Sequence, residues 1–188
     1  MLDVKELAKC IIEKAVRPGD KAIDATVGKG YDTAFLAGLV GERGCVYGFD
    51  IQEEALCKAK EYLASVGLDR EVILIQDGHQ HMNKHVHEKV RAVMFNLGYL
   101  PGGNHEIKTK ADTTITALEK SLDLLLPGGL ITIASYTGHP GGEEEKNVLK
   151  QYVTNLSSSM YKCVAIEALN QGNSPPVLFV VEKKGTGK

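Results

Sequence analysis

The stretch that decides the fold is residues 24–33, Asp24-Ala25-Thr26-Val27-Gly28-Lys29-Gly30-Tyr31-Asp32-Thr33. An apolar run leads into it, and a helical apolar pattern begins directly after it at Ala34. Gly28 and Gly30 allow a tight turn and let the backbone approach a ligand closely. Because open α/β sheets bind ligands at the carboxyl ends of their strands, the stretch predicts a strand, a ligand-binding turn and a helix.

The bulk composition is that of one globular domain. The chain has 188 residues, of which 43% are hydrophobic and 24% are charged, and its formal net charge is -2. These values exclude a disordered, a collagenous and a disulfide-scaffold protein. With 22 basic and 24 acidic residues, any binding of RNA must depend on a local patch. We expect residues 1–188 to form a single domain.

Strand-like runs alternate with helix-length segments along the chain. Apolar residues recur at helical spacing from Val4 to Ala15, and Pro127-Gly128-Gly129 closes a second helical stripe over residues 115–125. Five runs rich in Val, Ile and Phe span residues 21–26, 45–50, 71–76, 90–97 and 130–136. This alternation predicts βαβ units and a parallel sheet.

The chain ends in two further strand-like runs, residues 161–169 and 177–182, preceded by a helix over residues 143–156. Residues 170–176 are too short to form a crossover helix, so these two runs should pair antiparallel. The predicted fold is α/β, a Rossmann-like, seven-stranded doubly wound sheet with a C-terminal antiparallel hairpin. This arrangement resembles the class I methyltransferases that use S-adenosylmethionine.

Acidic residues stand at the ends of the second and third predicted strands. Asp50 lies twenty residues after Gly30, where a carboxylate can accept hydrogen bonds from both ribose hydroxyls of a nucleotide. Asp77 could accept from the exocyclic amine of adenine. Each acid alone could instead cap a helix, and the glycine turn could be an ordinary βα turn. Thr33 replaces the third glycine of the dinucleotide fingerprint, which weakens the case for a nicotinamide cofactor.

The fourth predicted strand ends in a loop with residues 96–103, Asn96-Leu97-Gly98-Tyr99-Leu100-Pro101-Gly102-Gly103. The Asn96 amide oxygen could accept a proton of an attacking amine and orient its lone pair toward a methyl sulfonium. Alternatively, Asn96 only turns the chain. No cysteine lies in a strand-tip loop, which favours methylation of nitrogen over methylation of carbon.

The loop after the fifth strand holds Tyr136 and His139. His139 could serve as a base or contact the substrate, or it could only cap the next helix. The segment from 79 to 87 contains His79, His81, His85 and His87, yet no acid or cysteine completes a recognised metal spacing, so we expect a solvated segment and no metal. Basic side chains near the expected site could contact phosphates or form a solvated face; these are Lys84, Lys89, Arg91, Lys108 and Lys110.

Four motifs, residues 24–33, 76–79, 96–102 and 136–142, resemble those of the small methyltransferases grouped as rRNA methylases, over nearly the whole chain. The resemblance implies S-adenosylmethionine as cofactor and RNA as partner. It implies N-methylation of the aminomethyl group of 5-aminomethyl-2-thiouridine at the tRNA wobble position. Alternatives are an rRNA base methyltransferase, an NAD-dependent oxidoreductase and a non-catalytic RNA-binding module. The family also suggests a homodimer.

The resemblance, added to the strand-tip pattern, gives the expected site. The expected catalytic residues are Asn96, Tyr99 and His139. The expected cofactor-binding residues are Thr26, Gly28, Gly30, Asp32, Thr33, Asp50, Gln52, Asp77, Gly78, His79 and Asn96. The expected substrate-binding residues are Leu97, Gly98, Pro101, Tyr136 and His139. One departure from the family's usual loop, Asn104-His105 in place of an acidic and basic pair, leaves the substrate-loop contacts open.

The cysteines and the first residues bear on the compartment. The four cysteines show no Cys-x-x-Cys spacing, and three of them lie in apolar or amphipathic stretches that predict burial. Charged residues within the first ten positions interrupt any signal-peptide core, and no apolar run approaches the roughly 18 residues that span a bilayer. We expect a cytoplasmic protein with no membrane segment.

Overall fold

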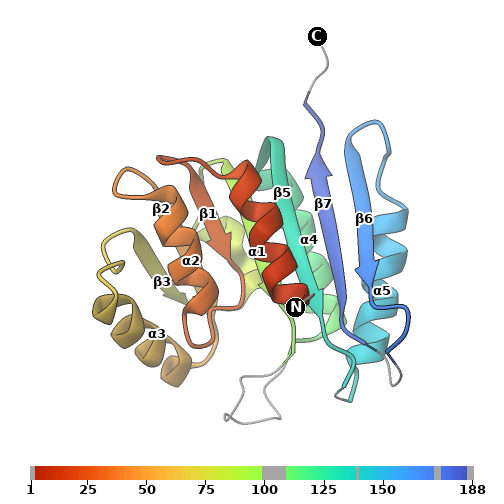
Figure 1. Cartoon of the computed structure of the whole chain (residues 1–188), viewed down its shortest axis with the longest axis horizontal. Coiled ribbons are helices and arrows are strands. Elements are labelled where there is room, and N and C mark those ends of the chain that lie inside the picture. The colour runs from red at the N-terminus through yellow and green to blue at the C-terminus, as the bar shows by residue number, and fades with distance from the viewer. Residues whose placement is uncertain (1–2, 99–108, 139, 172–174, 186–188) are drawn as a thin grey trace.

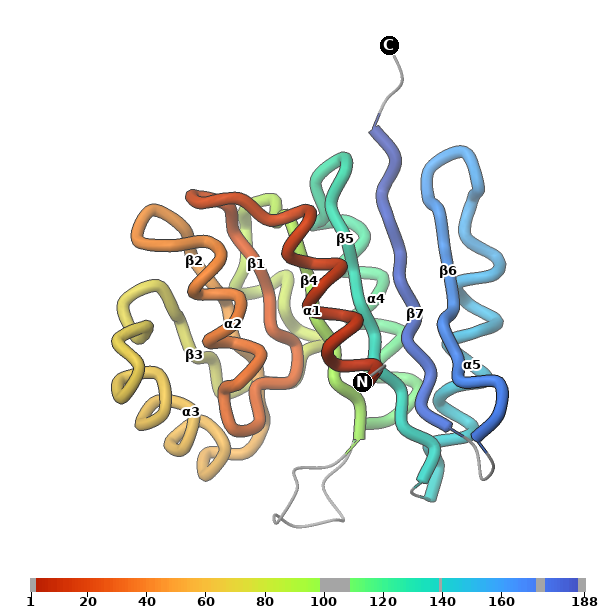
Figure 2. Tube along the Cα trace, in the orientation of Figure 1, coloured from red at the N-terminus to blue at the C-terminus, as the bar shows by residue number. Residues whose placement is uncertain are grey.

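The computed structural model describes residues 3–98, 109–138, 140–171 and 175–185. It contains a seven-stranded sheet in the order β3-β2-β1-β4-β5-β7-β6 (Figures 1 and 2). The strands are β1 (Lys21–Asp24), β2 (Cys45–Asp50), β3 (Val72–Gln76), β4 (Val90–Asn96), β5 (Leu125–Ser135), β6 (Tyr161–Glu167) and β7 (Val177–Lys183). The helices are α1 (Val4–Ala15), α2 (Tyr31–Val40), α3 (Glu53–Ser65), α4 (Ala111–Leu124) and α5 (Gly142–Thr154), with a 3₁₀ helix η1 (His79–Lys84).

The strand directions confirm the predicted α/β class and the terminal hairpin. Strands β1 to β5 are parallel, whereas β7 pairs antiparallel with both β5 and β6. The last strand in sequence is therefore inserted between β5 and β6. The burial of β7 explains this order. The five residues Val177–Val181 are buried and pair with a strand on each side, whereas β6, at the edge of the sheet, is largely accessible.

Helices cover both faces of the sheet, as expected of a doubly wound fold. In Figure 1, α1 and α2 lie in front of the sheet and α4 and α5 lie behind it. One core cluster joins apolar residues of α1 and α2 to the sheet, including Ile12 and Leu36. The other joins the opposite face to η1, α4 and α5, including Met82, Leu118 and Leu149. Burial of these two apolar surfaces is the main source of stability.

The start of β5 differs from the sequence-based expectation. The predicted helix stop at Pro127-Gly128-Gly129 lies inside β5, which begins directly after α4 at Leu125. The pairing with β4 shifts register there, since Val90 pairs with Leu125 but Ala92 pairs with Leu130. The irregularity takes up the extra residues as a bulge does, and Arg91 Nη1 donates to the Pro127 carbonyl at 2.9 Å.

The expectation of buried cysteines is wrong. All four are free; Cys10 and Cys57 are exposed, and Cys45 and Cys163 are half-buried. The first two occupy the outward sides of α1 and α3, where an amphipathic pattern tolerates a small residue. Across the part of the chain that the structure describes, no helix combines the length and the apolar character needed to cross a membrane.

Candidate active site

The glycine turn joins β1 to α2 at the carboxyl edge of the sheet. Gly30 has φ +82°, and a Cβ at this position would lie 3.0 Å from the backbone of Ala59, so both conformation and space require glycine. The turn is tied to β2, because the Gly28 N–H donates to Asp50 Oδ2 at 2.9 Å. Asp50 Oδ1 accepts from the Gln52 N–H at 2.9 Å. The Asp50 carboxylate is thus held in place at the end of its strand.

A cavity of about 900 Å³ opens at this edge. It is lined by twelve of the residues that the sequence predicted for the site: Thr26, Gly28, Asp32, Asp50, Gln52, Asp77, Gly78, His79, Asn96, Leu97, Gly98 and Tyr136. Gly30 shapes the turn from behind this lining. The predicted residues Tyr99, Pro101 and His139 lie outside the described residues. The carboxyl ends of β1, β2, β3, β4 and β5 therefore meet in one cavity, as the strand-tip pattern indicated.

Thr33 lies behind the cavity wall. Its side chain is completely buried, and its hydroxyl donates to Asp24 Oδ2 at 2.6 Å. Asp24 Oδ1 accepts from the Thr26 N–H at 3.0 Å. Burial, with the nearby Asp32 charge, raises the pKa of Asp24 to about 7. Thr33 and Asp24 support the glycine turn from the interior. Asp24 was not among the predicted site residues, although it is the first residue of the stretch 24–33.

Asp77 and two histidines form one hydrogen-bonded group at the end of β3. Asp77 Oδ1 lies 2.8 Å from His81 Nδ1, and Oδ2 lies 2.9 Å from His85 Nε2. The Gly78 N–H also donates to Oδ1 at 2.7 Å. The two histidine contacts hold the pKa of Asp77 far below its usual range. Both carboxylate oxygens face partners in the protein, so any contact with adenine would use their remaining lone pairs.

The histidine-rich segment is only partly solvated. His79 is buried, Nδ1 lies 3.1 Å from the Ala25 carbonyl oxygen, and the ring packs edge-on against Phe95. Burial lowers the pKa of His79, which favours the neutral ring. The expectation of a solvated segment is therefore wrong for this residue. Within the described ranges, no three His, Cys, Asp or Glu side chains are grouped so as to hold a metal ion.

Asn96 is held from two sides at the end of β4. Its backbone N–H donates to Thr26 Oγ1 at 2.8 Å, which joins the tips of β1 and β4. Its side-chain Nδ2 donates to Asp32 Oδ2 at 3.3 Å. With the amide nitrogen directed at Asp32, the amide oxygen Oδ1 is turned away from this carboxylate. The orientation agrees with an amide oxygen that accepts a hydrogen bond in the cavity.

The loop after Asn96 is anchored to α5, a contact that the sequence did not reveal. The Gly98 N–H donates to Thr109 Oγ1 at 3.1 Å, and the Thr109 N–H donates back to the Gly98 carbonyl at 3.0 Å. Thr109 Oγ1 in turn donates to Glu145 Oε2 at 2.9 Å, and Thr114 Oγ1 donates to Glu145 Oε1 at 2.7 Å. Glu145 is only 2% exposed. A buried carboxylate thus fixes both ends of the segment between Gly98 and Thr109.

Tyr136 and two lysines of α1 complete the wall beside Asn96. The Tyr136 hydroxyl is buried without a hydrogen-bond partner among the described residues, and burial raises its pKa. Lys5 Nζ lies 5.6 Å from the centre of the Tyr136 ring. Lys9 Nζ lies 3.4 Å from Asp32 Oδ1. The spacing of four residues puts Lys5 and Lys9 on one face of α1, which the sequence alone indicates. The sequence does not indicate that this face lies at the cavity.

Two further corrections concern apolar and basic residues. Ile51 lines the cavity directly after Asp50 and is 55% exposed, an apolar surface that the sequence-based expectation left out. Lys89 and Arg91 lie at the opposite edge of the sheet, where β4 begins, and donate to the carbonyls of Asp123 and Pro127. They are therefore remote from the site. Lys110 does line the cavity, and Lys108 lies outside the described residues.

Comparisons with known proteins show which family the chain belongs to. The model of the family described as "Putative rRNA methylase" matches residues 46–182, and that of protein-L-isoaspartate(D-aspartate) O-methyltransferase matches residues 5–86. The tRNA (mnm(5)s(2)U34)-methyltransferase, chloroplastic, of Arabidopsis thaliana is 38% identical over 95% of this chain and 69% of its own length.

Two crystal structures share the whole fold. A "putative rRNA-methylase" from Clostridium thermocellum is 43% identical, with a TM-score of 0.95 over 97% of this chain and 98% of its own. A "putative methyltransferase" from Streptococcus mutans in complex with SAH is 39% identical, with a TM-score of 0.89 over 97% of this chain and 99% of its own. The chain therefore belongs to the "Putative rRNA methylase" family and is an S-adenosylmethionine-dependent methyltransferase.

Proposed function

We propose that this enzyme methylates RNA on an exocyclic amine, namely the aminomethyl group of 5-aminomethyl-2-thiouridine at the tRNA wobble position. The observation that carries the proposal is the position of Asn96, whose Nδ2 is directed at Asp32 while the side chain lines the cavity. An amide oxygen can accept a hydrogen bond from an N–H of a neutral amine and so orient the nitrogen lone pair. The Arabidopsis relative, which is named for that nucleoside, supports the choice of substrate.

The residues of the cavity fit the cofactor. A pre-oriented carboxylate, Asp50, lies beside the glycine turn and suits ribose hydroxyls, and the exposed Ile51 offers an apolar surface for an adenine ring. When bound, S-adenosylmethionine supplies a methyl group on a sulfonium. We assign the cofactor to Thr26, Gly28, Asp32, Asp50, Gln52, Asp77, Gly78, His79 and Asn96, with Gly30 shaping the turn and Thr33 supporting it.

The substrate side of the cavity must take a neutral amine. An alkyl ammonium has a pKa of about 10.4, so it has to lose a proton before it can attack. Partial exclusion of water at Leu97, Gly98 and Tyr136 lowers the pKa of such an amine, because burial disfavours its charged form. The proton passes to water as the amine enters the cavity, and Asn96 Oδ1 then accepts a hydrogen bond from the neutral nitrogen. Tyr99, Pro101 and His139 remain predicted contacts for the nucleobase.

The proposal is tested by nucleoside mass spectrometry on tRNA and rRNA from cells that lack the protein. We expect 5-aminomethyl-2-thiouridine to accumulate in tRNA and the methylaminomethyl form to disappear, while rRNA nucleosides stay unchanged. Loss of a base methyl group from rRNA with intact wobble uridines would reject the tRNA substrate and leave the enzyme class in place. Purified enzyme with hypomodified tRNA and labelled cofactor should restore the modification.

We further propose that residues 1–188 act as one methyltransferase domain. We also propose that two copies form a homodimer and that the protein works in the cytoplasm. The near-balanced charge supports a partner that is recognised locally, because no global positive field draws RNA to the protein. Sedimentation equilibrium of the purified protein measures the assembly state, and a monomer at micromolar concentration would contradict the dimer.

A further inference from the structure

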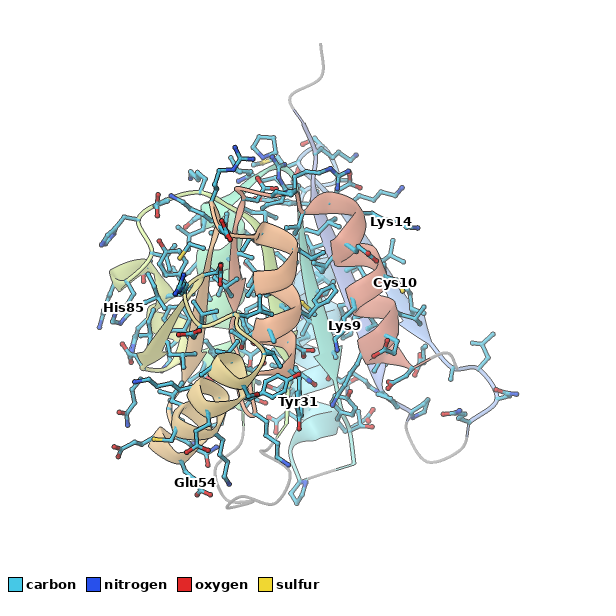
Figure 3. The ribbon with its side chains drawn as sticks, turned by 60° about the vertical axis from the view of Figure 1, so that its left-hand side comes forward. Lys9, Cys10, Lys14, Tyr31, Glu54 and His85 are labelled. Atoms are coloured by element: carbon cyan, nitrogen blue, oxygen red, sulfur yellow. The ribbon has the colours of Figure 1, made fainter. Side chains whose placement is uncertain are left out.

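Helix α1 contributes two lysines to the cavity, Lys5 and Lys9, and Lys9 is the one that forms an ion pair there. Its apolar residues Val4, Ala8 and Ile12 are buried against the sheet, which fixes the helix and the side that it turns to α2. Lys9 lies on that side, whereas Cys10 and Lys14 lie on the other (Figure 3). The Lys9 side chain is 25% exposed and lines the cavity. The ammonium is therefore a built part of the site and not a free surface charge.

Lys9 and Asp32 form a pair of opposite charges next to Asn96. Lys9 Nζ is 3.4 Å from Asp32 Oδ1, while Asp32 Oδ2 accepts from Asn96 Nδ2. Lys9 Nζ is also 3.9 Å from Glu6 Oε1, and it lies 5.7 Å from the centre of the Phe35 ring. The Lys9 and Asp32 side chains are 25% and 14% exposed, so the pair is partly shielded from water. Shielded charges attract complementary charges more strongly than exposed ones do.

The location of the pair selects the part of the cofactor that it faces. Asp50 and Asp77 lie at the ends of β2 and β3, on one side of the glycine turn, and suit the adenosine part. Lys9 of α1 and Asp32 in the first turn of α2 lie on the other side, next to Asn96 at the end of β4. The remaining part of S-adenosylmethionine is an amino acid, which carries one ammonium and one carboxylate.

We propose that Lys9 binds the carboxylate of the cofactor's methionine part and that Asp32 binds its ammonium. The ion pair between Lys9 and Asp32 then opens, and each of the two side chains binds the cofactor charge of opposite sign. Each charged group therefore keeps a partner. Helix α1, which precedes the glycine motif, thereby becomes part of the cofactor site. The inference concerns the cofactor alone, so it does not depend on which RNA is methylated.

The test measures binding of three thioethers by calorimetry without RNA. They are S-adenosylhomocysteine, its decarboxylated form, which lacks only the carboxylate, and 5′-methylthioadenosine, which lacks the whole amino acid. For the wild type, removal of the carboxylate should weaken binding about 10- to 100-fold, as expected for loss of a charged hydrogen bond. Equal affinity of the wild type for the first two ligands would overturn the proposal without any variant.

The variants identify the residues. Lys9→Met should lower the affinity for S-adenosylhomocysteine about 10- to 100-fold. It should change the affinity for the decarboxylated ligand less than about threefold, because that ligand has no carboxylate for Lys9 to bind. Asp32→Asn should weaken both of these ligands but not 5′-methylthioadenosine. Lys14→Met, on the far side of α1, is the matched control and should bind all three normally. Equal weakening of all three ligands by Lys9→Met would show a structural role and refute the assignment.

Discussion

The cavity has a cofactor half, at the glycine turn and the ends of β2 and β3, and an acceptor half, at Asn96, Leu97 and Gly98. The two halves are stabilised in different ways. On the cofactor half, Asp50 accepts hydrogen bonds from backbone N–H groups within its own and the neighbouring strand end. On the acceptor half, Gly98 depends on Thr109 and through it on Glu145, which lies 47 residues further along the chain in α5. The cofactor half is thus set by contacts between neighbouring strand ends, and the acceptor half by contacts with a helix behind the sheet.

This difference explains why one fold serves many substrates. Contacts between the ends of β1, β2 and β3 around the glycine turn preserve the cofactor half whatever follows the fourth strand. The acceptor half can change with the loop after Asn96 and with the helix that anchors it, because the two are linked by only a few hydrogen bonds. Variants in each half should therefore separate binding of the cofactor from transfer of the methyl group.

The largest effect is expected at the boundary between the halves. Asn96→Ala removes the amide oxygen that orients the amine, and kcat should fall about 1000-fold. The affinity for S-adenosylhomocysteine should fall much less, by about tenfold at most, since the alanine keeps the backbone N–H that donates to Thr26 and loses only the side-chain bond to Asp32. Single-turnover methylation and calorimetry measure the two quantities. Asn147→Ala, on the exposed part of α5, is the control, and normal methylation by Asn96→Ala would remove the proposed role.

The second effect is a pH dependence of the cofactor half. The folded pKa of Asp24 is raised from 3.8 to about 7, so its protonated form stabilises the fold fully below pH 3.8, and this contribution is lost as pH rises to 7. Asp24→Asn cannot lose a proton, so its stability relative to the wild type should rise on the order of 3 kcal/mol between pH 4 and pH 7. Urea unfolding at several pH values measures the trend. Asp69→Asn should leave the slope unchanged, and a parallel slope for Asp24→Asn would contradict the buried-acid assignment.

The third effect concerns the cofactor contact itself. Asp50→Ala removes a carboxylate that is already oriented, and the affinity for S-adenosylhomocysteine should fall about 100-fold, equivalent to about 2.7 kcal/mol. Asp50→Asn keeps an acceptor for one backbone N–H and should lose less. Calorimetry with both variants gives the comparison. If binding were unchanged in Asp50→Ala, the adenosine part could not lie at the end of β2.

The smallest effect is expected from the anchor of the acceptor half. Glu145→Ala leaves the hydroxyls of Thr109 and Thr114 without their acceptor, which should lower the free energy of unfolding by about 2 kcal/mol. The value of kcat should fall while the affinity for S-adenosylhomocysteine stays normal. Glu144→Ala changes an exposed neighbour and should do neither. A variant at 145 that lost cofactor affinity instead would show that the two halves are not separable.

Prediction from sequence succeeded where the pattern is local. The bounds of α1 and of β2 agree with the predicted ones, because the apolar spacing of each element marks its own ends. The start of β5 was missed, since Pro127-Gly128-Gly129 normally stops a helix but here occupies an irregular part of a strand. Thr33 was expected to line the site, whereas packing turned its hydroxyl toward Asp24.

The sequence by itself determined the class of protein. Alternating strand and helix periods, one glycine turn and polar residues at successive strand ends are local features, and they are enough to specify a parallel sheet with a nucleoside cofactor at its carboxyl edge. Only the tertiary structure decided that β7 lies between β5 and β6, that Lys9 reaches Asp32, and that Glu145 anchors the loop after Asn96. The physical reason is that these contacts join residues far apart in the chain, and periodicity within one element carries no information about which distant partner will cover it.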